Sequence, residues 1–94
     1  MLKNQKDELM KYLLKKEIFT TEKIANLTQN KIDMAIDLMN FLKTIGDNVK
    51  QNKKPENLTD KGFEQMRLHY VYLRRAVPEE LTDELLLEIS KELY

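Results

Sequence analysis

The chain carries few of the side chains from which catalytic and metal sites are built. His69 is the only histidine and there is no cysteine, so neither a zinc ligand set nor a thiol nucleophile can be assembled. Four acidic residues stand together near the C-terminal end: Glu79, Glu80, Asp83 and Glu84. They lack the glycine-bearing loop of a calcium site and are typical of the first turn of a helix. The sequence therefore predicts a protein that is not an enzyme and holds no metal or cofactor.

The chemistry that the sequence does favour is binding of anions by lysine. The formal net charge is zero, but 15 basic and 10 acidic side chains precede residue 76, whereas one basic and six acidic side chains follow Arg75. Lysines gather in a turn-prone stretch at Lys50, Lys53 and Lys54. This asymmetry indicates an anion-binding body with an acidic tail or, equally well, charges that only keep two faces of the protein solvated.

Residues 20–46 contain the elements that would position these lysines. A short helical pattern begins at Thr20 or Thr21, either of which can cap its first turn. It contains the apolar pair Ile24-Ala25. A polar break follows, and Asn30 is predicted to cap a second, longer and mostly buried helix. That helix is predicted to end at Gly46, because glycine adopts the left-handed conformation of a helix end most easily. A short helix, a turn and a long helix form a helix-turn-helix.

Three further helices and one polar segment complete the predicted architecture. Residues 7–19 have the apolar spacing of a helix, as do residues 60–76 after the capping Thr59. Residues 78–93 have it too, and this last helix either starts at Pro78 or is capped by Thr82. Residues 47–59 are rich in turn-forming residues and lysine, which favours a small two-stranded hairpin. A chain this short fills one modest core, so residues 1–94 are expected to form a single domain.

In this order the elements resemble a winged helix-turn-helix domain, and most of all the MarR-type and PadR-type bacterial regulators. The residues that carry the resemblance are Ile24-Ala25, Gly46 and the segment Leu58-Thr59-Asp60-Lys61-Gly62. It covers residues 20–63, a little under half of the chain. The resemblance implies a mainly α fold, a winged helix-turn-helix with a small β-hairpin wing at residues 47–59 and an extra C-terminal helix.

The resemblance also implies a function, that of a small transcriptional or replication-control regulator that binds double-stranded DNA as a homodimer. The long helix would lie in the major groove and the wing against phosphate or the minor groove. The implied DNA-binding residues are Asn30, Lys31, Asn40, Lys43, Thr44, Lys50, Gln51, Asn52, Lys53 and Lys54. The implied dimer interface is Leu81, Leu85, Leu86, Ile89 and Leu93. This apolar stripe of the C-terminal helix fits packing inside one subunit equally well.

The residues support a rival hypothesis, in which a winged helix binds another protein in place of DNA. Asp33 and Asp37 lie on the presumed reading face, where carboxylates repel phosphate. No arginine precedes Arg67, so the helix-turn-helix and wing cannot make the bidentate guanine contact. Another protein is therefore the second candidate partner. No membrane partner is expected, because no apolar tract spans a bilayer and no leader is recognisable, and a cytoplasmic location is predicted.

Overall fold

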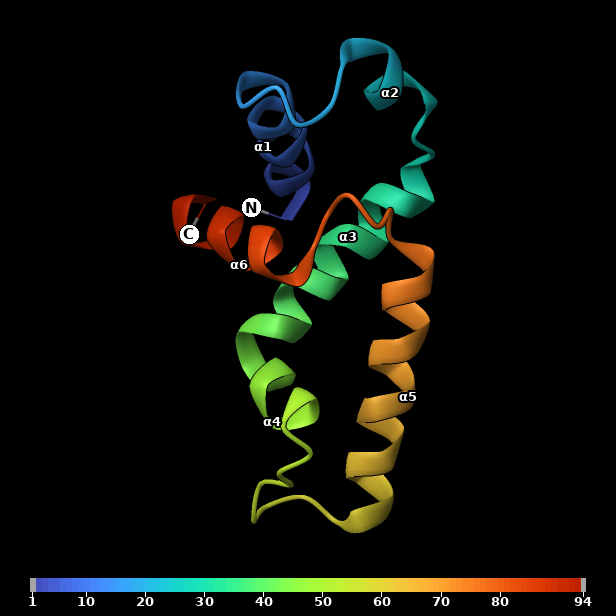
Figure 1. Cartoon of the computed structure of the whole chain (residues 1–94), viewed down its shortest axis with the longest axis vertical. Helices are drawn as coiled ribbons and strands as arrows, with labels where there is room; N and C mark the ends of the chain where they lie inside the picture. Colours follow the sequence, from blue (N-terminus) through green and yellow to red (C-terminus); the bar gives the residue numbers. More distant parts are fainter. Residues whose placement is uncertain (1, 94) are drawn as a thin grey trace.

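The described part of the chain is built from helices alone. The structure is a computed structural model that describes the backbone of residues 2–93 and the side chains of residues 5–92. The elements are α1 (Leu2–Lys15), α2 (Thr21–Asn26), α3 (Gln29–Phe41), the π-helical segment η1 (Leu42–Gly46), α4 (Asp47–Lys50), α5 (Asp60–Ala76) and α6 (Asp83–Leu93). The molecule is elongated, 43 × 23 × 22 Å, and α5 runs along one side of it (Figure 1).

Threonine side chains begin four of the helices. The Oγ1 atoms of Thr20, Thr28, Thr59 and Thr82 each accept a hydrogen bond, 3.0 to 3.2 Å long, from the backbone N–H three residues further along. Each cap satisfies an amide that the helix itself leaves unpaired and is worth about 1 kcal/mol. The prediction that Asn30 caps the long helix is wrong, because the helix already begins directly after Thr28.

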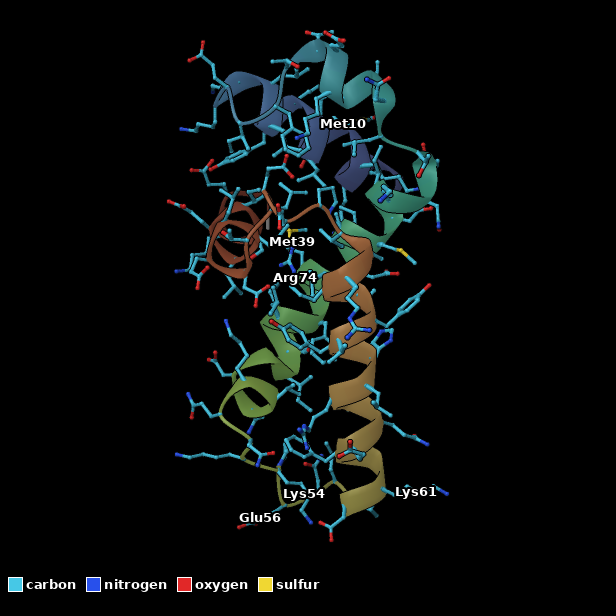
Figure 2. All side chains as sticks on the ribbon, turned by 45° about the vertical axis from the view of Figure 1, so that its right-hand side comes forward. Met10, Met39, Lys54, Glu56, Lys61 and Arg74 are labelled. Atoms are coloured by element: carbon cyan, nitrogen blue, oxygen red, sulfur yellow. The ribbon has the colours of Figure 1, made fainter. Side chains whose placement is uncertain are left out.

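The central helix is α3, which packs against α1, α5 and α6. Its side chains Leu38 and Met39 are completely buried, and Figure 2 shows Met39 inside the molecule between the surrounding helices. The other fully buried large side chains are Leu9, Leu13, Leu73, Leu81, Leu86 and Ile89. The helix that the resemblance assigns to a DNA groove is therefore the axis of the hydrophobic core.

The predicted β-hairpin wing is wrong. Residues 47–59 hold α4, a turn and an irregular segment, and no strand occurs anywhere in the described residues 2–93. Gly46 does not end the helix, since its φ of −56° and ψ of −44° are helical. Continuing the helix through η1 buries Val49, which is only 8% exposed, and this favours a further helical turn over a hairpin of weak strand formers. The predicted mainly α fold is consistent with the structure, but its β-hairpin wing is corrected, because the described residues 2–93 form helices and no sheet.

The long helical stretch ends at Asn52, whose φ of 57° lies in the left-handed region. The N–H of Asn52 donates to the carbonyl of Val49 at 3.2 Å, and the next N–H donates to the carbonyl of Asn48 at 2.9 Å. These two bonds define the Schellman end of a helix. The same arrangement ends α1 at Glu17, with a φ of 58°. Asparagine tolerates this conformation better than most residues, so it can end the helix once the burial of Val49 has favoured helix beyond Gly46.

The other predicted helices are confirmed, with shifted ends. The helix predicted at residues 60–76 has the bounds of α5. The helix predicted at residues 7–19 begins earlier, at Leu2, and ends at Lys15, because the left-handed end described above stops it. The helix predicted at residues 78–93 begins at Asp83, after the Thr82 cap.

Candidate interaction surfaces

The predicted DNA-binding residues are spread along the helical stretch that runs from α3 to the segment after α4. Asn30 and Lys31 lie in the first turn of α3, whereas Lys53 and Lys54 follow α4 at the other end of the same helical stretch (Figure 1). About 20 helical residues lie between the two pairs, which corresponds to roughly 30 Å at a rise of about 1.5 Å per residue. The first turn of the long helix and the lysine-rich segment therefore lie at opposite ends of this stretch, with Asn40, Lys43, Thr44 and Lys50 between them.

Several of these predicted residues make contacts within the chain. Lys50 Nζ lies 3.3 Å from a carboxylate oxygen of Asp83, and Lys54 Nζ lies 2.9 Å from one of Asp60. The hydroxyl of Thr44 donates to the backbone carbonyl one turn earlier, at 3.0 Å. Of the other predicted residues, Asn40 is half-buried and six are exposed: Asn30, Lys31, Lys43, Gln51, Asn52 and Lys53.

The stripe predicted as a dimer interface on α6 mostly faces the interior of the same subunit. Leu81, Leu86 and Ile89 are buried in the chain's own core, while Leu85 is half-buried. The side chain of Leu93 lies outside the described residues. The sequence was compatible with packing between two subunits or inside one subunit. The three buried residues pack inside one subunit.

A half-buried polar cluster joins α4, α5 and α6 around the buried Asp83. The hydroxyl of Tyr70 donates to one carboxylate oxygen of Asp83 at 2.5 Å, and Arg74 Nη1 donates to the other at 2.6 Å. Lys50 from α4 supplies the third contact. Arg74 Nη2 also donates to two backbone carbonyls of the connection between α5 and α6, at 3.1 and 2.7 Å. The cluster thus holds α6 and the segment before it in a defined orientation relative to α5.

These contacts change the ionisation of both acids in the cluster. Burial by itself would raise the pKa of Asp83, but the hydrogen bonds from Tyr70, Arg74 and Lys50 outweigh it and lower the pKa below its ordinary value of 3.8. Burial, followed by the hydrogen bond to Asp83, raises the pKa of Tyr70 to about 12. The carboxylate is therefore held ionised and the phenol neutral, an arrangement that stabilises the fold.

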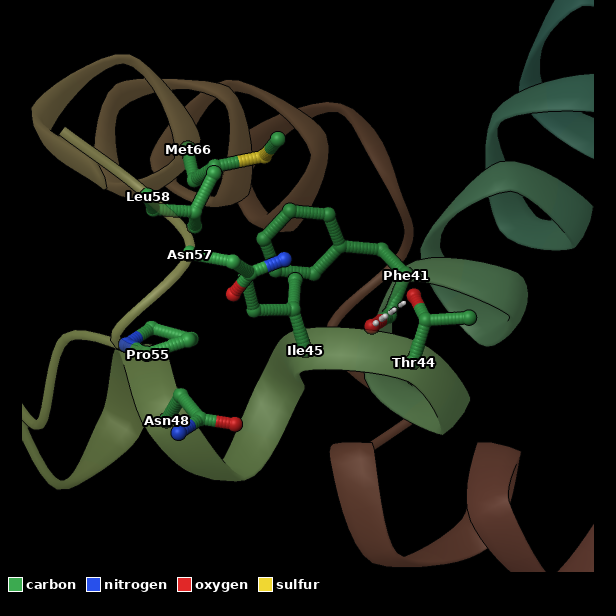
Figure 3. Close-up of a pocket in the computed structure, with 8 residues that line it drawn as sticks. All are labelled: Phe41, Thr44, Ile45, Asn48, Pro55, Asn57, Leu58 and Met66. Atoms are coloured by element: carbon green, nitrogen blue, oxygen red, sulfur yellow. Dashed lines mark hydrogen bonds between the residues drawn. The ribbon is translucent and has the colours of Figure 1, made fainter. Parts of the chain in front are cut away.

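A groove of about 530 Å³ lies between η1, α5 and the segment that connects α4 to α5 (Figure 3). Its lining residues are Phe41, Thr44, Ile45, Asn48, Pro55, Asn57, Leu58 and Met66. The side chain of Asn48 donates to the carbonyl of Lys53 at 3.1 Å, and the Thr44 hydroxyl is bonded to the backbone. With no charged side chain in its lining, the groove is an indentation over the core and offers little to direct a specific ligand.

Three of the four exposed large apolar side chains among the described residues lie on the outer face of α5, and the fourth is Leu14 of α1. Leu68, Tyr72 and Val71 are 62%, 56% and 42% exposed. At about 100° per residue, Leu68 points directly away from the buried side of α5, which carries Phe63 and Leu73. Shallow hollows of about 400 and 420 Å³ adjoin this ridge. Clustered exposed apolar side chains mark contact sites more often than scattered ones do.

The orientation of Tyr72 is fixed by its neighbours. Its ring stacks on His69 with 6.5 Å between ring centroids and 22° between planes. His69 in turn meets the edge of the buried Phe41 ring at 5.8 Å. An exposed tyrosine that packs against neighbouring rings is suited to anchor an interface, because it buries a large ring at a small cost in side-chain entropy.

Comparison with protein-family models, curated proteins and solved structures finds no match to this chain. No group of three His, Asp or Glu side chains suited to a metal ion occurs among the described residues. In the same part of the chain, every helix is too short or too polar to cross a membrane. The function is therefore inferred from the geometry of this chain itself.

Proposed function

We propose that this chain is a protein-interaction module that binds another polypeptide through the outer α5 face. This face is defined by Leu68, Val71 and Tyr72 together with Glu64 and Arg75 at its borders. The observation that carries the proposal is the exposure of three large apolar side chains on one side of the longest described helix, directly opposite its buried side. Removing these apolar side chains from water is favourable, so contact with another polypeptide would stabilise the bound state.

The composition of the outer α5 face favours a polypeptide over a small molecule. Tyrosine and arginine are the residues that most often carry binding energy at protein interfaces. The face is a ridge with shallow hollows beside it, whereas small molecules bind in concave pockets. Its residues repeat at the three- and four-residue spacing of a helix that packs against another helix.

Binding of duplex DNA as a regulator, which the sequence resemblance implies, is the second candidate. Its support is the lysine-bearing end of the molecule, where Lys53, Lys54 and Lys61 are exposed. Glu56 also lies at this end (Figure 2), and Lys54 is paired with Asp60. Acidic side chains among the lysines weaken a phosphate-binding surface, so the protein-binding proposal has the stronger support.

Photo-crosslinking from the outer α5 face tests the proposal. A benzophenone amino acid in place of Tyr72 is expected to give a discrete protein adduct in cells that produce the chain. The same substitution at the exposed Glu22 is expected to give none. Adding Leu68→Asp should remove the adduct, because a carboxylate desolvated in an apolar contact is unfavourable. Equal adducts from both positions, or an adduct insensitive to Leu68→Asp, would contradict the proposal.

A gel-retardation assay separates the second candidate from the first. At about 50 mM salt, the protein-binding proposal predicts no retardation of duplex DNA, whereas a phosphate-binding protein retards it strongly. Retardation that weakens as salt is added would favour the DNA hypothesis. It would do so if the slope of the logarithm of the binding constant against the logarithm of the salt concentration also fell by about one in Lys53→Ala.

A further inference from the structure

We infer that the partner of the outer α5 face is a second copy of this chain, bound with the two α5 helices packed antiparallel. This inference rests on the proposed function and names the partner that the proposal leaves open. It follows from the order of charged and apolar residues along a single stripe of α5.

The stripe consists of four residues separated by four, three and four positions: Glu64, Leu68, Val71 and Arg75. This is the spacing by which one helix forms a straight seam along another. The two apolar residues occupy the middle of the stripe and the two charges its ends, with the acid towards the N-terminus and the base towards the C-terminus. The stripe therefore has opposite charges at its two ends.

An antiparallel pair makes this stripe complementary to itself. A two-fold axis between His69 and Tyr70 places Leu68 opposite Val71 of the second copy, and Glu64 opposite its Arg75. Both contacts occur twice by symmetry. A parallel pair would instead place Glu64 opposite Glu64 and Arg75 opposite Arg75, and like charges repel. The charge order thus selects both the partner and its direction.

The charges at the ends of the stripe are accessible for such contacts. Glu64 pairs with Arg67 on its own helix at 3.2 Å, and both side chains are about half exposed. Arg75 is exposed and joins no ion pair among the described residues. A second copy would supply the carboxylate that Arg75 lacks. Because two helices alone bury a small area, the dimer is expected to be weak, with a dissociation constant in the micromolar range.

Charge exchange within the stripe tests the inference by sedimentation equilibrium. Glu64→Arg and Arg75→Glu each place like charges opposite one another, so each is expected to raise the dimer dissociation constant about fivefold or more. The double variant restores opposite charges and should return the constant to near the wild-type value. Glu22→Arg, a charge reversal on α2 and outside the stripe, should leave it unchanged. Two single variants without effect, or a double variant that stays weakened, would overturn the antiparallel arrangement.

Disulfide trapping provides a second readout, because the natural chain has no cysteine. A mixture of Leu68→Cys and Val71→Cys proteins is expected to form mixed dimers faster than either protein forms dimers with itself. Faster dimers of Leu68→Cys alone would indicate a parallel or different packing and overturn the inference. A wild-type chain that stays monomeric at high concentration would also overturn it. If the chain is monomeric, a Tyr72 adduct with a different protein would still support the proposed function. If it is monomeric and gives no adduct at all, both the proposed function and this inference are overturned.

Discussion

At the scale of single residues, Asp83 contacts three groups that come from two other helices. Tyr70 and Arg74 lie one turn apart on α5, and Lys50 lies on α4. From the sequence, Asp83 is recognisable only as an acid in the first turn of a helix, which it also is. Its partners could not be predicted, because they come together only when α4 and α5 pack beside α6. The one local signal is the spacing of Tyr70 and Arg74, which places both on one side of a helix.

Replacing Asp83 with asparagine is expected to lower the free energy of unfolding by about 2 to 3 kcal/mol, because charged hydrogen bonds are lost and Arg74 stays half-buried without a counter-ion. Glu84→Gln, an exposed neighbouring change, should have little effect. Urea denaturation monitored by circular dichroism measures both. Equal stability of the two variants would contradict a stabilising role for the cluster.

The pH dependence of stability provides a separate check on Asp83. Its pKa is lowered in the folded state, so its contribution is present above the unfolded-state pKa near 3.8 and is lost as the pH falls through the lower folded-state pKa. Stability of the wild-type chain should therefore fall more steeply in acid than that of Asp83→Asn. Parallel acid profiles from the same denaturation series would exclude this linkage.

At the scale of elements, the helices were predictable because their apolar spacing and threonine caps are local signals. Three of the caps, at Thr20, Thr59 and Thr82, lie where the sequence places them. The predicted structure is wrong after Gly46. There the local preference of glycine for ending a helix opposes the burial of Val49, and burial prevails. Burial depends on α5 packing nearby, which no local pattern reports.

The two glycines offer a matched test of these helices. A Cβ at Gly62 would lie 3.1 Å from the exposed Thr59 hydroxyl and 3.9 Å from a methyl group of Leu58, an ordinary van der Waals distance. Gly62→Ala is therefore expected to stabilise the fold by about 0.5 kcal/mol through helix propensity. A Cβ at Gly46 would lie 3.0 Å from a methyl group of the buried Leu42, so Gly46→Ala should destabilise it. Urea midpoints that rank the two variants in the reverse order would contradict the helical packing described here.

At the scale of the whole molecule, the outer α5 face could not be predicted because apolar residues occur on both sides of this helix. The spacing of Phe63, Met66, Tyr70, Val71 and Leu73 suggested one set of core contacts. The structure divides them, burying Phe63 and Leu73 and leaving Val71 exposed beside Leu68. Which side of a helix faces inward is decided by the positions of the other helices. The candidate site is therefore visible only after the chain is folded.

The central claim is that the outer α5 face is covered by a polypeptide when the protein acts. Hydroxyl-radical labelling, read by mass spectrometry, tests this claim most directly, with the half-buried Tyr12 of α1 as an internal reference. Tyr72 is predicted to be labelled several times more slowly in producing cells than in dilute purified protein, while Tyr12 reacts equally in both. Equal labelling of Tyr72 under the two conditions would contradict the account.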